Sequence, residues 1–223
     1  MITMEGIKII GTSHIARSSM EEVRDTIESE RPDIVALELD RHRLYSLVNN
    51  IQRGPSIRDV LRIGITGYLF TLIGGIIQKK LGNVVGISPG SEMLTAYEAA
   101  KKNRLKVSLI DQDIQKTLSR FSTLFNMREK LRVVGDIFKG LLFPDKRLRF
   151  DLSKVPSDEL VEKLLDEIKV RYPGLHKALI EERNRYMAQA LLKLRETYPD
   201  SRIVAVVGAG HKRGIMRILD SGL

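Results

Sequence analysis

The sequence contains no cysteine and no tryptophan, and only 5% of its 223 residues are aromatic. Without cysteine it can form no disulfide framework, no thiolate zinc site and no cysteine nucleophile. Its first residues lack the apolar run of a secretory signal. The longest uncharged run, Ile63–Gln78, is shorter than the roughly 20 residues that a membrane-spanning helix needs. We therefore expect a soluble, cytoplasmic domain, with contact to a membrane surface as an open alternative.

Basic residues outnumber acidic residues, with 37 Lys and Arg against 28 Asp and Glu. An excess of this sign can serve an anionic partner, either nucleic acid or a lipid surface. The densest stretch, residues 128–149, has seven basic and three acidic residues. No helix-turn-helix, zinc finger or aromatic stacking motif accompanies it. The sequence therefore favours a solvated basic face, and we expect no nucleic-acid partner.

Four short apolar runs rich in β-branched residues are typical of parallel strands that are covered on both faces. They are Ile7–Ile10, Ile34–Leu39, Val107–Ile110 and Ile203–Val207. Helical patterns separate these runs along the chain. The alternation predicts an α/β fold, with a central, mainly parallel sheet flanked by helices.

Capping and proline signals predict where several helices begin and end. The expected helices run from Ser18 or Ser19 to Glu30, from Glu92 to Lys102, from Pro156-Ser157 to Tyr172-Pro173, and from Leu175 to Thr197. For the first helix, a capping box of Ser18 or Ser19 with Glu21 or Glu22 is the expected start.

The middle of the chain is helical in pattern with no strand, over Arg58–Leu81 and again over Phe121–Phe143. The first of these segments is apolar on more than one face, which predicts a buried helix or a helical hairpin. An oligomer interface or an in-plane membrane contact is the alternative. We predict one α/β domain over residues 1–223, with helical insertions at 56–82 and 121–150. Glycine-rich apolar helices also suit self-association, so we expect a homo-oligomer, a dimer.

Two of the four histidines stand in the same local frame. Residues 11–14 read Gly-Thr-Ser-His after the first predicted strand, and residues 208–211 read Gly-Ala-Gly-His after the last. A glycine permits a sharp exit from the strand, and a polar group three residues on can turn into the crevice at the carboxyl edge of the sheet. A capping histidine and a plain tight turn are the alternative interpretation. His42 and His176 lie in charged helical surroundings, where we expect surface residues.

Acidic residues follow the other two predicted strands at equivalent places. Glu38 lies at the end of the second strand, and Asp111 and Asp113 follow the third. Open parallel sheets bind ligands outside the carboxyl ends of their strands, so these carboxylates are expected to converge with His14 and His211. Glu38 carries particular weight, because a carboxylate inside an apolar strand is costly to bury without a partner.

Two imidazoles with one or more carboxylates form a suitable shell for zinc, manganese, cobalt or iron, with open positions for water. They also form a suitable metal-free acid/base set. Glu92 is predicted in the first turn of a helix, where the helix dipole favours it without any function. Arg183 is predicted inside a long helix, from which it could reach and orient a strand-end carboxylate. A solvated run of charges is the alternative for Arg183.

Taken together, these segments resemble the TraB/PrgY (pheromone shutdown) family, which is related to the TIKI and GumN-like proteins. The matching stretches, in the order of the family, are residues 11–14, 32–40 with Arg43, 89–93, 111–114, 182–187 and 206–211. The resemblance covers nearly the whole chain and implies an α/β fold with a metal-dependent hydrolase centre. The two Gly-x-x-His motifs of the family map onto His14 and His211, and its acidic position after the second strand maps onto Glu38. Gln112 stands where the family commonly has arginine, so the charge of that arginine is missing here.

The resemblance also implies a substrate class, because TIKI members act as metal-dependent peptidases and PrgY-like members block or degrade a peptide pheromone. The leading hypothesis is a hydrolase of peptides that uses a divalent transition metal. Its expected metal ligands are His14, Glu38 and His211, and its expected catalytic residues are Glu38, Glu92, Asp111, Asp113 and Arg183. Among these, Glu92, Asp111 or Asp113 would act as base or orienter, and Arg183 would stabilise a developing oxyanion. The alternatives are a module that binds a peptide or small ligand without turnover, and a scaffold at a membrane surface.

Overall fold

The computed structural model describes residues 3–4, 6–12, 17–51, 90–142 and 157–222. The strands are β1 (Thr3–Met4), β2 (Ile7–Thr12), β3 (Ile34–Leu37), β4 (Lys106–Leu109) and β5 (Ile203–Gly208). The helices are α1 (Arg17–Glu30), α2 (Arg41–Val48), α4 (Ser91–Lys102), α5 (Ile114–Leu124), α6 (Met127–Leu142), α7 (Asp158–Arg171), α8 (Pro173–His176), the π-helix η2 (Lys177–Glu181), α9 (Glu182–Thr197) and α10 (Ala209–Ser221). Within these ranges, no helix is both long enough and apolar enough to cross a membrane.

The strands form one sheet in the order β1-β2-β5-β3-β4. Strands β2, β5, β3 and β4 are parallel, and the two-residue β1 pairs antiparallel with β2 at the edge. Every residue of β3 and β5 is buried, as expected for the central strands of a sheet with both faces covered. The predicted α/β fold with a central, mainly parallel sheet is therefore confirmed.

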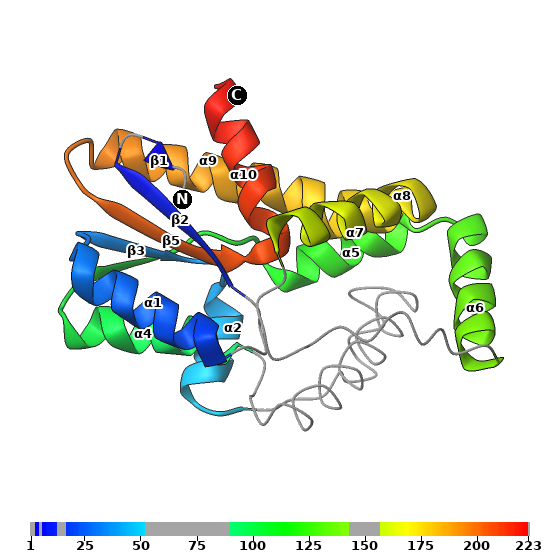
Figure 1. The fold of residues 1–223 in the computed structure, drawn as a ribbon, viewed down its shortest axis with the longest axis horizontal. Coiled ribbons are helices and arrows are strands. Elements are labelled where there is room, and N and C mark those ends of the chain that lie inside the picture. Colours follow the sequence, from blue (N-terminus) through cyan, green and yellow to red (C-terminus); the bar gives the residue numbers. More distant parts are fainter. Residues whose placement is uncertain (1–2, 5, 13–16, 52–89, 143–156, 223) are drawn as a thin grey trace.

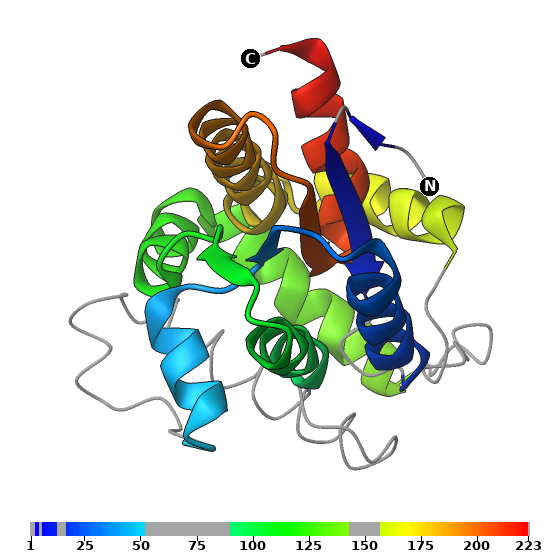
Figure 2. The ribbon, with the colours of Figure 1, turned by 90° about the vertical axis from the view of Figure 1, so that its left-hand side faces the viewer.

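Successive strand residues point to opposite faces of the sheet, and each face has its own hydrophobic core. Ala36 and Ala205 pack with residues of α9 and α10 on one face. Val35 and Val204 pack with residues of α1 and α4 on the other face. Figures 1 and 2 show these two helical layers on either side of the sheet.

A third, smaller core lies beyond the sheet, where α5, α6, α8 and η2 meet. Phe121 and Phe125 stack with their ring centroids 4.7 Å apart, and both pack with Ala178. Figure 1 shows α6 at the end of the molecule away from the sheet. The predicted insertion at 121–150 is helical as far as Leu142. The rest of it, and the whole insertion at 56–82, lie outside the described residues, so the division into one domain with two insertions stays a prediction.

Several expected boundaries were wrong by a few residues. Helix α1 begins at Arg17, so Ser18 and Ser19 lie within its first turn and do not cap it. The chain turns at Glu38, where Leu39 N–H donates to Leu37 O (2.7 Å), so β3 is shorter than the apolar run. The expected long helix over 175–197 begins earlier and contains η2, a single π-helical turn ahead of α9.

Candidate functional site at the carboxyl edge of the sheet

The carboxyl ends of β2, β5, β3 and β4 lie at one edge of the sheet, because these strands are parallel. Glu38 directly follows β3, Asp111 follows β4 by two residues, and His211 follows β5 in the first turn of α10. All three residues are buried. The chain therefore brings together polar side chains from three separate strand ends, as the sequence predicts.

Each carboxylate oxygen of Glu38 has its own partner. Oε2 accepts a hydrogen bond from the backbone N–H of Gly208 (2.6 Å), and Gly208 caps the N-terminus of α10. The positive end of the helix dipole stabilises a negative charge at that place. Oε1 accepts from Arg183 and lies 3.5 Å from Nε2 of His211. These contacts meet the requirement that a buried carboxylate be paired.

Arg183 reaches the strand ends from α9, and all five of its N–H groups have acceptors. Nε donates to Asp111 Oδ1 (3.2 Å), and Nη2 donates to Asp111 Oδ2 (2.6 Å) and to Glu38. Nη1 faces Leu179 O (3.4 Å) and Nε2 of His211 (2.9 Å). Burial alone would lower the pKa of Arg183, but the charges of Glu38 and Asp111 raise it above its usual value, so the guanidinium stays charged. The expected contact between Arg183 and strand-end carboxylates is confirmed.

A second arginine, Arg43 on α2, adds a positive charge to the site. Its guanidinium donates to Asp111 and, from Nε, to Asp40 Oδ2 (2.7 Å). Asp40 caps α2 by accepting from the backbone N–H groups of His42 (2.8 Å) and Arg43 (3.0 Å). Burial alone would raise the pKa of Asp40, but the hydrogen bonds and charge of Arg43 hold it below its usual value. Asp111 therefore has two arginine partners, although Gln112 carries no charge.

The imidazole of His211 is held through both of its nitrogens. Nδ1 lies 2.7 Å from Oδ1 of Asn184, and Nε2 faces Arg183 and Glu38. Asn184 is buried in α9, next to Arg183 in the sequence. The first turn of α9 thus supplies contacts to three strand ends at once.

Glu92 lies in the first turn of α4, as predicted, and is 1% exposed. It lines a cavity of about 470 Å³ together with Glu38, Arg43 and Arg183. Gly90, Met93 and Leu47 contribute to the wall of this cavity. A volume of this size is typical of a small-ligand site.

Asp113 and two of the histidines take other places. Asp113 caps α5 by accepting from Gln115 N–H (2.7 Å), and its Oδ2 lies 3.9 Å from Nε2 of the exposed His42. The interpretation of His176 as a surface residue was wrong. His176 is 7% exposed, because α8 packs against α5, and its Nδ1 lies 3.2 Å from Glu181 Oε1. His14, the remaining predicted ligand, lies outside the described residues.

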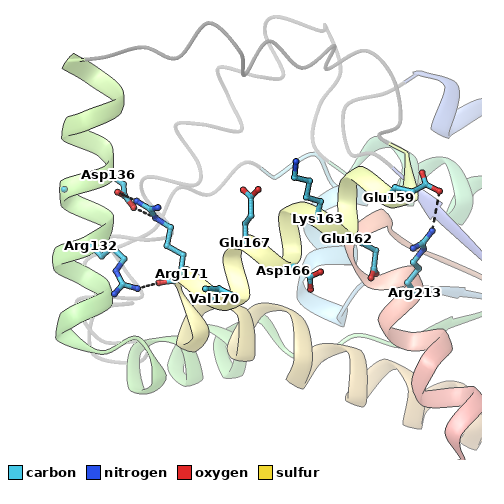
Figure 3. Close-up of a pocket in the computed structure, with 11 residues that line it drawn as sticks. Arg132, Asp136, Glu159, Glu162, Lys163, Asp166, Glu167, Val170, Arg171 and Arg213 are labelled. Atoms are coloured by element: carbon cyan, nitrogen blue, oxygen red, sulfur yellow. Dashed lines mark hydrogen bonds and ion pairs between the residues drawn. The ribbon is translucent and has the colours of Figure 1, made fainter.

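A larger cavity, of about 1190 Å³, lies between α6 and α7 and holds none of the strand-end residues. Figure 3 shows two of its arginines turned toward acidic side chains, Arg171 toward Asp136 and Arg213 toward Glu159. Arg171 donates to Asp136 from Nε (2.7 Å), and Arg213 lies 3.8 Å from Glu159. We therefore place the candidate site at the smaller cavity, which is lined by the strand-end carboxylate Glu38 and by Glu92 of α4.

The sequence pointed to Glu38, Arg183 and His211 but gave no role to Arg43 or Asn184. Both belong to the stretches that carry the family resemblance. The role of Arg43 could have been predicted from the sequence. Asp40 is a typical residue at the start of a helix, and the side chain of Arg43, three residues later, can fold back onto it. No comparable local signal exists for Asn184, whose partner lies 27 residues away.

Comparison with known proteins identifies the family of this chain. The model of the TraB/PrgY/gumN family matches residues 2–221. The chain belongs to the TraB/PrgY/gumN family. The uncharacterized protein MJ1365 of Methanocaldococcus jannaschii is 39% identical over 217 residues, which cover 96% of this chain and 53% of that protein.

Mammalian members of the TraB/PrgY/gumN family are also similar over most of this chain. The human TraB domain-containing protein is 27% identical over 237 residues, covering 94% of this chain and 61% of its own length. The mouse protein of the same name has the same identity and coverage. The chain thus spans between half and two thirds of the length of these curated relatives. The family assignment that the sequence motifs indicated is confirmed.

Proposed function

We propose that this member of the family is a metal-dependent hydrolase of peptides, with His14, Glu38 and His211 as ligands of a divalent transition metal. The main support is the arrangement of His211, whose Nε2 lies 3.5 Å from Oε1 of Glu38. Its Nδ1 is turned to the carbonyl oxygen of Asn184. Metal-binding histidines commonly use one ring nitrogen for the ion and the other for such an orienting contact.

The described donor atoms fit such an ion. Two ligands at about 2.1 Å from one tetrahedral ion lie about 3.4 Å apart, close to the separation of Nε2 and Oε1. Imidazole nitrogen with carboxylate oxygen suits zinc, manganese, cobalt or iron. Within the described residues, no group of three or more His, Asp or Glu side chains is placed to hold a metal. The third ligand would be His14, which follows Thr12 by two residues, and Thr12 is paired with Gly208 at the end of β5.

Arg183 also contacts the two proposed ligand atoms, Nε2 of His211 and Oε1 of Glu38. An ion between His211 and Glu38 would replace the contact of Nη1 with His211, while Arg183 keeps its two hydrogen bonds to Asp111. Because the other N–H groups of Arg183 keep their acceptors on Asp111, Glu38 and Leu179, orienting the carboxylates is better supported than stabilising an oxyanion. We therefore propose Arg183 as the residue that holds Glu38 and Asp111 in position.

The proposed general base is Glu92. It lines the 470 Å³ cavity together with Glu38, and it belongs to a different element, the first turn of α4. A bound divalent ion supplies an activated water and polarises a carbonyl group, and Glu92 would take the proton of that water. Asp113 is not part of this proposal, because its carboxylate caps α5.

The first test is elemental analysis of protein purified without a histidine tag. We expect close to one equivalent of transition metal in the wild type and its loss in His211→Ala. His42→Ala is the matched control, because His42 is exposed and should not alter the metal content. No metal in the wild type after reconstitution would contradict the proposal, and capture of an intact peptide would then support the binding-module alternative.

The second test separates catalysis from metal binding. Glu92→Gln should keep the metal and lower the hydrolysis of a peptide library, followed by mass spectrometry, by about 10²–10⁴-fold. Glu98→Gln, an exposed position on the same helix, should hydrolyse the library as the wild type does. Equal rates in all three proteins would remove Glu92 from the mechanism.

A further inference from the structure

His211 can carry its single proton, in the neutral form, on either nitrogen, and its neighbours decide which one. Arg183 has only donors, so the contact of its Nη1 with Nε2 of His211 (2.9 Å) requires a lone pair on Nε2. The proton is then on Nδ1, which donates to Oδ1 of Asn184 (2.7 Å). This assignment also fixes the amide of Asn184, with its oxygen toward the ring and its NH2 group away from it.

The NH2 group of Asn184 lies directly over Gly214, one turn after His211 on α10. A Cβ atom at Gly214 would lie 2.1 Å from Nδ2 and 3.0 Å from Cγ of Asn184. Real Cβ atoms do not approach so closely, so any side chain at this position would displace the amide. Glycine is one of the poorest helix formers, and its presence inside α10 is explained by the space that Asn184 needs.

We propose that Asn184 and Gly214 together form a tautomer lock, which keeps the proton of His211 on Nδ1 and leaves the lone pair on Nε2, the nitrogen that faces Arg183 and Glu38. Asn184 supplies the acceptor, and Gly214 supplies the space that brings this acceptor within reach. Both residues are positioning residues, because they act on the site only through His211. The consequence of the lock for metal binding rests on the proposed function, whereas the tautomer itself does not.

The tautomer can be measured directly by long-range ¹H–¹⁵N correlation spectra of protein labelled at histidine, recorded at a pH where His211 is neutral. His211→Gln assigns its signals among those of the four histidines. In the wild type we expect a pyrrole-type shift at Nδ1 and a pyridine-type shift at Nε2. The opposite pattern in the wild type would overturn the proposal.

The variants separate the acceptor from the space around it. Asn184→Leu removes the acceptor, and Gly214→Ala keeps Asn184 but displaces its amide, so both should shift His211 toward the Nε2–H tautomer. Asn184→Asp keeps an acceptor oxygen and should retain the proton on Nδ1. Gly210→Ala is the matched control on the same helix, because a Cβ there meets nothing within 4 Å. Unchanged tautomers in both Asn184→Leu and Gly214→Ala would overturn the proposal.

A second measurement connects the lock to metal binding. Titration of Zn²⁺ by calorimetry should show an affinity about 10- to 100-fold lower in Asn184→Leu and Gly214→Ala than in the wild type, with Gly210→Ala unchanged. Equal Zn²⁺ affinities in all four proteins would overturn the role of the lock in metal binding. If the wild type binds no Zn²⁺, the proposed function fails, and the nitrogen shifts still decide on the tautomer lock.

Discussion

At the scale of single residues, the charge balance of the site depends on Arg183. Its guanidinium is shared between Glu38 and Asp111, and both carboxylates are buried. Arg183→Met would leave Glu38 buried without a side-chain cation and should lower the free energy of unfolding by about 3–5 kcal/mol. Arg185→Met, at an exposed position of the same helix, should change it by less than about 0.5 kcal/mol. Similar urea midpoints for the two variants would contradict this account.

The buried His176 makes the stability of the fold depend on pH. Burial lowers the pKa of His176 below 6.5, although the charge of Glu181 acts to raise it. Between the pKa values of His176 in the folded and unfolded chain, the unfolded chain binds more protons than the folded one. The stability associated with neutral His176 is therefore fully present above about pH 6.5 and is lost as the pH falls below it. His176→Gln should flatten the dependence of the unfolding free energy on pH between about 7 and 5.

Urea titrations at several pH values measure this dependence. The exposed His42 provides the control, and His42→Gln should keep the slope of the wild type. A slope that is the same in His176→Gln as in the wild type would exclude His176 as its source.

The residues that sequence reasoning identified correctly share one physical property. Glu38 stands in an apolar strand and needs a partner when buried, and Arg183 is a donor that can provide it, so each pointed to the other. The burial of His176 could not be read in the same way, because it depends on how α5, α6 and α8 pack. The contact of Arg43 with Asp111 spans 68 residues and needs the parallel pairing of β3 and β4.

At the scale of elements, α8 is joined to α6 through the buried carboxylate of Glu129. Its Oε1 accepts from the backbone N–H of Gly174 (2.7 Å), and its Oε2 accepts from that of Asn126 (3.3 Å). A Cβ at Gly174 would lie 2.3 Å from the backbone oxygen of Leu124 and 2.5 Å from Oε2 of Glu129. The backbone of α5 would have to move to make room.

Gly174→Ala should therefore lower the free energy of unfolding by about 1–3 kcal/mol. Gly135→Ala on α6 is the matched control, because a Cβ there meets nothing within 4 Å. That substitution should stabilise the protein by about 0.5–1 kcal/mol, since alanine favours a helix over glycine. Denaturant unfolding of both variants tests the sign as well as the size, and a stabilising Gly174→Ala would show that α8 is not packed as described.

The elements that could be predicted from the sequence are those with a clear apolar pattern. The continuous apolar run of β5 identified a buried strand, and the run that contains β3 did the same. Helix α10 was not foreseen, because its first residues are Ala-Gly-His and suggest a turn. Gly208 has φ −60° and ψ 144°, so the strand passes into the helix without any left-handed residue. Burial of Ile215 and Leu219 against the sheet outweighs the weak helix propensity of the first turn.

At the scale of the whole molecule, the site joins the two ends of the sequence. Strand β5, the last along the chain, lies between β2 and β3. The residue that ends β2, Thr12, pairs with Gly208, and Leu37 pairs with Val206. The sequence predicted that strand ends converge, but the order of the strands depends on which helices cover each face, and no local pattern specifies it.

Because of this topology, metal binding should be measurable as an increase in the global stability of the fold. Ligands at His14, Glu38 and His211 would hold together segments almost 200 residues apart, and such a site does not exist in the unfolded chain. Zn²⁺ at 100 times its dissociation constant should add about 2.7 kcal/mol to the free energy of unfolding. For a chain of this length that amounts to an increase in Tm of about 5–10 °C.

The increase should disappear on addition of a chelator and be absent in His211→Ala, whereas His42→Ala should show it in full. Thermal unfolding followed by circular dichroism measures all four conditions. An equal increase in the wild type and His211→Ala would mean that the ion binds away from the carboxyl edge of the sheet. Because the shift reports binding to the folded state and not turnover, it separates the metal centre from the hydrolytic step that Glu92 is proposed to perform.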